Sequence, residues 1–267
     1  GNNEIGTLNP IREIGQITRN KGVLFHTDAT QGVGKIPIDV EEMNIDLLSL
    51  TAHKIYGPMG IGALYVGKKP HVRLEPMFNG GGQENGLRSG TLPLPLCVGL
   101  GHALKIAKME MDNEAVRLKT QRDTIWQRLN SELPGLYLNG DFEHRVPGNL
   151  NISVEGLDAE SLMASLPDLA ISSGSACTSA SEESSHVLKA LGLSNELAEA
   201  SLRIGIGRFN TDEEIEKLSG KEINNISTYD ELGNPSLGGI CDDAMGVSAL
   251  DKLSTCKTCG CTSSHCP

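Results

Sequence analysis

The chain has 267 residues, of which 38% are hydrophobic and 21% charged, a composition typical of a globular protein with a sizeable core. Its formal net charge of -11 argues against nucleic-acid binding, because contacts to phosphates need clustered lysine and arginine. No apolar run approaches the roughly 18 to 20 residues that a membrane span needs, and the polar opening from Gly1 lacks the pattern of a signal peptide.

The seven cysteines are unevenly distributed. Cys97 and Cys177 lie far apart, and the other five fall between Cys241 and Cys266. A secreted domain held by disulfides usually carries its cysteines throughout the chain. We therefore expect a reducing compartment, which would be the cytoplasm, or the mitochondrial matrix if the source is eukaryotic.

The first part of the chain alternates helical and strand patterns. Asn9 is predicted as the N-cap and Pro10 as the first residue of a short helix that runs to about residue 20. Apolar strands are predicted at 23–28, 45–52 and 61–66. Helices that alternate with apolar strands favour an α/β domain with a mainly parallel sheet.

The second part begins with a long helical pattern over about 96–132, which ends at Leu133-Pro134-Gly135. Further elements are expected in this order: strands at 136–138 and 150–154, a helix at 158–166, a strand at 169–171, a helix at 181–191 and a strand at 202–206. Thr211 and Glu214 form a capping box that opens a final helix. Residues 113–218 are predicted to form a smaller α/β domain, and 219–267 a loosely structured, cysteine-rich tail.

Lys54 stands between the predicted strand at 45–52 and a turn that begins at Gly57-Pro58. A lysine at such a position can be partly desolvated, which favours its neutral amine. Neutral amines form Schiff bases with carbonyl groups, that of pyridoxal phosphate among them. A solvated lysine at a strand end is the commoner case for a lone lysine.

Polar residues follow the ends of two predicted strands, where ligands gather in α/β sheets. The carboxylate of Asp28 could pair with a pyridinium nitrogen, and Gln31 could donate to a phenolic oxygen. Thr51 and His53 could supply a hydroxyl and an imidazole to a phosphate. Each could equally be a cap, a turn residue or a satisfied polar group at a strand end.

Two features of the second part also suggest chemistry. Cys177 lies among small residues ahead of a predicted helix, so its sulfur should be reachable and its thiolate favoured, although a linker with an incidental cysteine fits as well. Arg203, on a predicted strand, could hold a substrate carboxylate through two hydrogen bonds.

These motifs occur in one order along the chain: Asn2-Asn3-Glu4-Ile5-Gly6, His26-x-Asp28-x-x-Gln31, His53-Lys54-Ile-Tyr-Gly-Pro, Gly80-Gly-Gly, Arg88-Ser-Gly-Thr91, Ser173-Gly-Ser-Ala-Cys177-Thr-Ser and Arg203. In this the chain closely resembles a cysteine desulfurase of the iron–sulfur cluster assembly type, within the class V aminotransferase-like superfamily. The resemblance covers about residues 1–217. It implies the fold of pyridoxal phosphate-dependent transferases (aspartate aminotransferase-like). Residues 1–112 would be the C-terminal part of the large, mainly parallel cofactor-binding domain, and 113–218 the small C-terminal α/β domain.

The resemblance also implies roles for the residues. Lys54 would hold pyridoxal phosphate, and Cys177 would attack the sulfur of the cofactor-bound L-cysteine, giving L-alanine and a persulfide on Cys177. A mobile loop would then carry the sulfur to an iron–sulfur scaffold protein or another acceptor. The other implied contacts are Asp28 with the ring nitrogen, Gln31 and Asn3 with the phenolic oxygen region, Asn3 also with the substrate, Thr51 and His53 with phosphate, Thr91 with the phosphate of the other subunit of a homodimer, and Arg203 with the substrate carboxylate.

The chain departs from the family pattern at both ends. Family members carry an earlier segment with a histidine that stacks on the cofactor and a phosphate-binding turn, so we expect the chain to be incomplete at its N-terminus. After about Leu218 the pattern of the family is lost. Thiolates suited to zinc or an iron–sulfur cluster follow there, at Cys256, Cys259, Cys261 and Cys266, with Cys177 as a further shared cluster ligand.

Two alternatives to the desulfurase remain open. A selenocysteine lyase or a related β-eliminating enzyme would use the same cofactor, but persulfide formation needs an acceptor thiol such as Cys177. An inactive fragment could instead act as a metal-binding or interaction module through its cysteine-rich tail.

Overall fold

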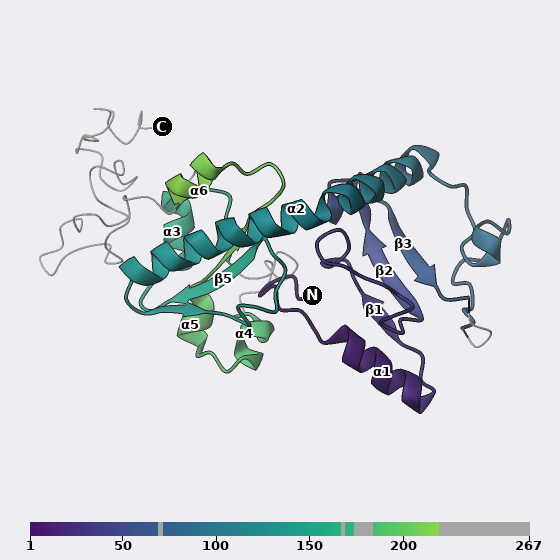
Figure 1. Ribbon diagram of the computed structural model, residues 1–267, viewed down its shortest axis with the longest axis horizontal. Helices are drawn as coiled ribbons and strands as arrows, with labels where there is room; N and C mark the ends of the chain where they lie inside the picture. Colours follow the sequence, from purple (N-terminus) through teal and green to yellow (C-terminus); the bar gives the residue numbers. More distant parts are fainter. Residues whose placement is uncertain (69–71, 167–168, 174–183, 219–267) are drawn as a thin grey trace, which may run out of the picture. The chain divides into compact units, whose positions relative to one another are not determined.

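The computed structural model describes residues 1–68, 72–166, 169–173 and 184–218 (Figure 1). In these ranges the elements are α1 (Ile11–Lys21), β1 (His26–Asp28), β2 (Leu47–Thr51), η1 (Ala52–Ile55), β3 (Gly62–Val66), η2 (Glu84–Gly86), α2 (Leu94–Glu132), β4 (Leu136–Leu138), β5 (Asn149–Val154), α3 (Ala159–Ser165), α4 (His186–Ala190), α5 (Asn195–Glu199), β6 (Ser201–Gly205) and α6 (Asp212–Leu218).

The chain divides into two compact units. Unit 1 consists of Gly1–Asn2, Thr7–Arg117 and His144–Pro147. Unit 2 consists of Asn3–Gly6, Leu118–Glu143 and the described residues from Gly148 onward. The helix α2 contributes to both units, since the division falls between Arg117 and Leu118.

Unit 1 contains a three-stranded sheet in the order β1-β2-β3, labelled in Figure 1. The strands β1 and β2 are parallel, with His26 opposite Leu47 and Asp28 opposite Ser49. The strand β3 runs antiparallel to β2. A parallel β3 would need a crossover of a dozen or more residues, and the connection 52–61 is shorter than that. Within the described residues this sheet is therefore mixed.

Two apolar clusters hold unit 1 together. Ala29, Ile45 and Leu48 form one, with Ile11 of α1 packed against it. Ala52 and Ile55 of η1 form the other, together with Leu100 and Ala103 of α2. Burial of these side chains fixes α1, η1 and the first half of α2 against the sheet and its connections.

A glycine in the middle of α1 shows how closely that helix packs. A Cβ atom at Gly15 would lie within 1.9 Å of the carbonyl oxygen of Met43. A larger residue would force α1 away from the segment before β2. This close packing explains why Gly15 stands in the helix, although glycine weakens an isolated helix.

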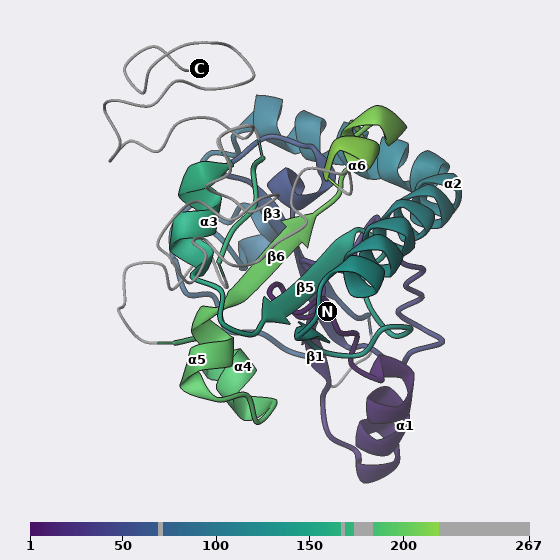
Figure 2. The ribbon, with the colours of Figure 1, turned by 90° about the vertical axis from the view of Figure 1, so that its left-hand side faces the viewer.

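Unit 2 is built on an antiparallel sheet in the order β4-β5-β6, whose strands β5 and β6 lie side by side in Figure 2. The central strand β5 is buried on both faces. Its apolar face carries Leu150 and Ile152, which join Leu202 and Ile204 of β6 and Ile125 of α2 in the largest core cluster.

The other face of β5 buries polar groups that satisfy one another. The side-chain amide of Asn139 donates to the Oδ1 atom of Asn151 and to the Oγ atom of Ser153, each at 2.8 Å. The amide of Asn151 in turn donates to the backbone oxygen of Glu4 at 3.2 Å. These bonds tie the short segment Asn3–Gly6 to the sheet of unit 2, since a buried polar group left unpaired would be costly.

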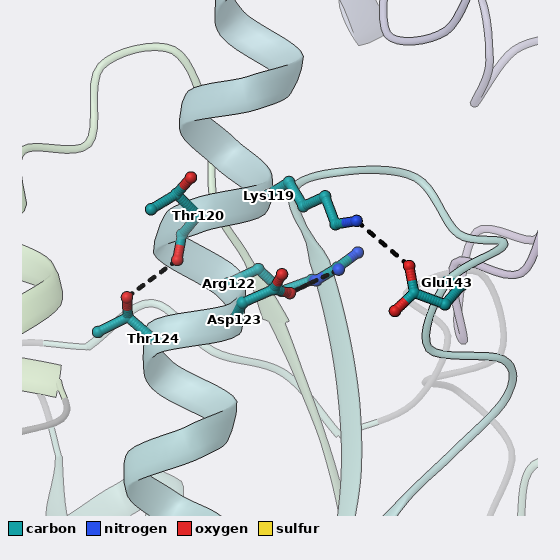
Figure 3. Close-up of polar contacts among 6 residues, drawn as sticks. All are labelled: Lys119, Thr120, Arg122, Asp123, Thr124 and Glu143. Carbon is teal, nitrogen blue, oxygen red and sulfur yellow. Dashed lines mark hydrogen bonds and ion pairs between the residues drawn. The ribbon is translucent and has the colours of Figure 1, made fainter.

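The second half of α2 is attached to the loop at 139–143 by charged and aromatic side chains, of which Figure 3 shows the charged ones. Lys119 forms an ion pair with Glu143 at 3.2 Å. The fully buried guanidinium of Arg122 donates to Asp123 and lies 4.9 Å from the centre of the Phe142 ring. A cation over an aromatic face is stabilised when both are shielded from water.

Most predicted elements of the second part are confirmed. The long helix, the strands β4, β5 and β6 and the helix α3 lie within a few residues of their predicted positions. The capping box is also confirmed, because the Glu214 amide donates to Thr211 Oγ1 at 3.2 Å and the Thr211 amide donates to Glu214 Oε2 at 3.1 Å. The two reciprocal bonds satisfy amides that the start of α6 would otherwise leave unpaired.

Three predictions of local structure are wrong. The helix α1 starts one residue late, because Pro10 itself takes the capping position with a ψ of 70°, and no side chain caps the helix. Residues 169–171 form no strand, because the amides of Leu169 and Ile171 bond locally to Leu166 and Leu169. In the helix predicted at 181–191, residues 184 and 185 are not helical and α4 begins at His186, which Ser185 caps, while residues 181–183 lie outside the described residues.

Candidate functional site

The parallel strands β1 and β2 bring two of the predicted site residues to one sheet edge. Asp28 is the last residue of β1, and Thr51 is the last residue of β2. Because the strands run in the same direction, their carboxyl ends open on the same side. Such an edge is where ligands bind in α/β sheets.

The carboxylate of Asp28 is held in its charged form. A hydrogen bond from the Thr30 side chain lowers the pKa of Asp28 below its usual value, and the Thr30 amide, 2.8 Å from Oδ1, adds to this effect, while partial burial opposes it. A carboxylate that stays anionic is suited to pair with a protonated ring nitrogen.

Thr51 and His53 lie together at the start of η1. Thr51 Oγ1 is 2.9 Å from His53 Nδ1 and 3.2 Å from the backbone oxygen of Ile61. Ile61 directly precedes β3, the strand that pairs with β2, so this bond fixes the hydroxyl at the sheet edge. The one proton of the Thr51 hydroxyl goes to the Ile61 oxygen here, so this proton would have to turn toward an anionic group such as phosphate for Thr51 to bind it.

Lys54 lies within η1 and is exposed, so the expected partial desolvation is wrong for this structure. The reason is the single 3-10 turn that follows β2. In this turn, residues three apart lie on one side, and Ala52 and Ile55 are both buried. Lys54, which lies between them, therefore faces solvent. The amine is therefore accessible to a carbonyl compound at the same end of the strand that carries Thr51.

Gln31 lies in the turn after β1, where it contacts Lys35. Lys35 Nζ is 3.4 Å from Gln31 Oε1. Burial lowers the pKa of Lys35, and the nearby positive charge of Lys54 lowers it further, while Glu114 of α2 opposes the shift. The ammonium groups of Lys35 and Lys54 thus lie near each other in unit 1, and that of Lys35 contacts the Gln31 amide.

In unit 2 the structure brings Arg203 and Asn3 together. Arg203, on β6, donates through Nε to Ser172 Oγ at 3.1 Å and through Nη1 to the backbone oxygen of Asn3 at 3.1 Å. Ser172 and Arg203 also form a bridge through their backbones. The two side-chain bonds fix the plane of the guanidinium, which is the group expected to bind a carboxylate.

The other predicted site residues are placed differently. Thr91 is exposed and lies just before α2, in unit 1. Cys177 and the tail cysteines Cys256, Cys259, Cys261 and Cys266 lie outside the described residues. Within the ranges that the structure describes, there is no cluster of three or more histidine, cysteine or acidic side chains that could hold a metal ion.

Sequence reasoning missed Lys35 and Ser172. Lys35 follows Gln31 by four residues, a spacing that brings side chains together wherever the chain turns helically. Ser172 gave no comparable signal, because its contact with Arg203 depends on pairing between segments far apart in the sequence.

The donor set in unit 1 fits pyridoxal phosphate. A carboxylate kept anionic, an exposed lysine amine, an amide and a hydroxyl–imidazole pair gather around the ends of β1 and β2. These groups match the ring nitrogen, the aldehyde, the phenolic oxygen and the phosphate of that cofactor.

A family model for class V aminotransferases matches residues 1–218. The chain belongs to this family. The cysteine desulfurase IscS of Rickettsia bellii is 53% identical over 242 residues, which cover 90% of this chain and 59% of that protein. The cysteine desulfurase IscS of Ehrlichia chaffeensis is 56% identical over 232 residues, covering 86% of this chain and 57% of that protein. The chain thus spans a little under 60% of the length of these curated relatives.

Solved structures agree on the fold of the family. A NifS-like protein from Rickettsia africae superposes with a TM-score of 0.73 at 30% identity, over 82% of this chain and 58% of that one. A protein named SspA, solved in complex with cysteine, superposes with a TM-score of 0.63 at 38% identity, over 77% of this chain and 56% of its own. The fold is therefore that of the pyridoxal phosphate-dependent class V aminotransferases. No helix in the described part of the chain has the length and apolar character to cross a membrane.

Proposed function

We propose that this chain acts in a pyridoxal phosphate-dependent cysteine desulfurase, which converts L-cysteine to L-alanine and leaves a persulfide on the enzyme. The observation that carries the proposal is the identity of 53% and 56% to two cysteine desulfurases over at least 86% of the chain. The grouping of Asp28, Thr51, His53 and Lys54 at one sheet edge supports it.

The residues of unit 1 would hold the cofactor. Lys54 would bind its aldehyde carbon, and Asp28 would keep its ring nitrogen protonated. Gln31 would donate to the phenolic oxygen, and Thr51 and His53 would bind the phosphate. The contact with the phenolic oxygen region implied for Asn3 stays a prediction. When bound, pyridoxal phosphate supplies an electron sink for bond cleavage at the substrate carbons.

The sulfur transfer itself would depend on Cys177 and Arg203. Arg203, with its plane fixed by Ser172, would hold the substrate carboxylate. The thiol of Cys177 would form a sulfur–sulfur bond with the substrate as the substrate carbon–sulfur bond breaks. The free thiol thereby becomes a persulfide, and L-cysteine becomes L-alanine without an external oxidant.

The assembly and partners follow from the same proposal. We expect a homodimer in which Thr91 contributes to the phosphate site of the other subunit, and transfer of the persulfide sulfur to an iron–sulfur scaffold protein or another acceptor. We expect the enzyme in the cytoplasm, or in the mitochondrial matrix of a eukaryote.

The proposal also assigns the parts of the chain. Residues 1–112 would belong to the large cofactor-binding domain and 113–218 to the small domain with the Cys177 loop. For 219–267, outside the described residues, binding of zinc or an iron–sulfur cluster by Cys256, Cys259, Cys261 and Cys266, with Cys177 as a shared cluster ligand, stays a prediction. Metal analysis of the purified protein with and without these cysteines would test it.

The test of the proposed function is the variant Cys177→Ala. We expect it to lose sulfide release from L-cysteine in the presence of a thiol reductant, while its cofactor absorbance stays that of the wild type. Cys97→Ala, which changes the partly buried cysteine of α2, is the matched control and should keep both. Sulfide release by Cys177→Ala at the wild-type rate would show that another group accepts the sulfur.

A further inference from the structure

The turn after β1 holds Gln31 and Lys35 in a fixed relation. The amides of Gly32 and Val33 both donate to the carbonyl oxygen of Ala29, and the amide of Lys35 donates to that of Gly32 at 3.0 Å. These bonds fold residues 29–35 into successive tight turns, which bring the side chains of Gln31 and Lys35 together. As a result, Lys35 Nζ reaches Gln31 Oε1 at 3.4 Å.

Packing against other elements of unit 1 fixes this turn. Gly34 has a φ of +71°, and a Cβ atom there would lie 2.9 Å from Ala107 Cβ and 3.0 Å from Ile55 Cγ2. The backbone next to Lys35 therefore lies directly against α2 and against η1, the element that carries Lys54. The Lys35 side chain is partly buried, which restricts where its amine can go.

We propose that Lys35 is a positioning residue, which orients the side-chain amide of Gln31 toward the cofactor by binding its oxygen. The inference rests on the proposed function and extends it to a residue outside the assigned site. Lys35 itself would not touch the cofactor.

The donors and acceptors of the Lys35 amine and the Gln31 amide determine which way the amide points. A protonated lysine amine has three donors and no acceptor, so it can bind the oxygen of a glutamine amide but not the nitrogen. With Oε1 of Gln31 bound to Lys35, Nε2 must point the other way, as a donor for an acceptor such as a phenolic oxygen. The reversed amide would place N–H groups against an ammonium group, which is unfavourable.

The distance of 3.4 Å is at the long end for such a bond. Hydrogen bonds at catalytic sites are often long without ligand and shorten when it binds. The contact would then be stronger in the cofactor-bound protein, where the orientation of Gln31 matters.

The experiment is a double-mutant cycle on cofactor affinity. The dissociation constant for pyridoxal phosphate is measured by absorbance titration for the wild type, Lys35→Met, Gln31→Ala and the double variant. We expect Lys35→Met to weaken binding about 10-fold in the wild-type background, equivalent to about 1.4 kcal/mol. In the Gln31→Ala background the same change should alter binding less than about 2-fold, because its target is gone.

Two further variants separate positioning from a general effect of charge or folding. Lys35→Arg keeps a donor and should bind the cofactor within about 3-fold of the wild type. Lys108→Met removes the same charge from an exposed position of α2 and should leave binding unchanged. If Lys35→Met fails to fold, Lys35→Gln, which keeps a polar end, takes its place in the cycle.

An equal loss in both backgrounds would overturn the inference, because Lys35 would then act without Gln31. Unchanged affinity in Lys35→Met would overturn it as well. Both outcomes leave the proposed function intact, since the wild type still binds the cofactor through Lys54. A wild-type protein that binds no pyridoxal phosphate would instead refute the proposed function, and this inference with it.

Discussion

Replacing Arg203 with lysine would test the substrate site with a magnitude that the structure sets. Ser172 and Asn3 take two of the five N–H donors of the guanidinium, one on Nε and one on Nη1. Three donors are left, one on Nη1 and two on Nη2, and these would bind the two oxygens of a carboxylate. Lysine keeps the charge but presents its donors from one nitrogen, so it loses this two-point binding.

The expected loss is one charge-assisted hydrogen bond. Such a bond contributes about 1.5 to 3 kcal/mol, and a loss of about 2 kcal/mol corresponds to a roughly 30-fold weaker affinity. We therefore expect Arg203→Lys to raise the KM for L-cysteine about 30-fold in an alanine-formation assay, with little change in kcat, because the carboxylate lies away from the reacting sulfur.

The same substitution at an exposed site is the control. Arg19→Lys on α1 should change neither KM nor kcat. An unchanged KM in Arg203→Lys, with the protein folded and the cofactor bound, would refute the assignment of Arg203 to the substrate carboxylate. A fall in kcat without a rise in KM would point instead to a role in the chemical step.

Three further predictions concern stability. Gly34→Ala should lower the free energy of unfolding by about 2 kcal/mol or more in urea, since the new Cβ meets Ala107 at a positive φ. Thr211→Ala should cost about 1 kcal/mol in the same assay through the lost cap of α6, whereas Thr211→Ser should restore most of it. Because the folded pKa of Asp28 is lowered, the stability it contributes is present above its ordinary pKa of 3.8 and lost as pH falls through the folded value. The difference in unfolding free energy between the wild type and Asp28→Asn should therefore shrink on acidification below that pH, and a constant difference would contradict the shift.

The sequence predicted those elements whose signals are local. The capping box at Thr211 and Glu214 and the period of the long helix each depend on residues within a few turns, and both are confirmed. The short helix α5 was missed, although Ser194 caps it through a bond to the Leu197 amide. With five residues, it is too short for an apolar period to mark it.

The errors arise where tertiary context decides. The exposure of Lys54 depends on which residues of a single 3-10 turn face the core, and strand pattern alone does not contain that information. Residues 169–171 are apolar enough for a strand, but their amides bond within the segment and only Ser172 pairs with β6. Lys35 was overlooked because its contact with Gln31 requires the turn that the Ala29 carbonyl organises.

Borohydride reduction would show whether the residues after β1 and β2 form a pyridoxal phosphate site. The purified protein is incubated with the cofactor, treated with borohydride and mapped by peptide mass spectrometry. We expect a reduced pyridoxyl adduct on Lys54 that is absent from Lys54→Ala. An adduct on Lys35 instead, or none on a folded protein, would contradict this expectation.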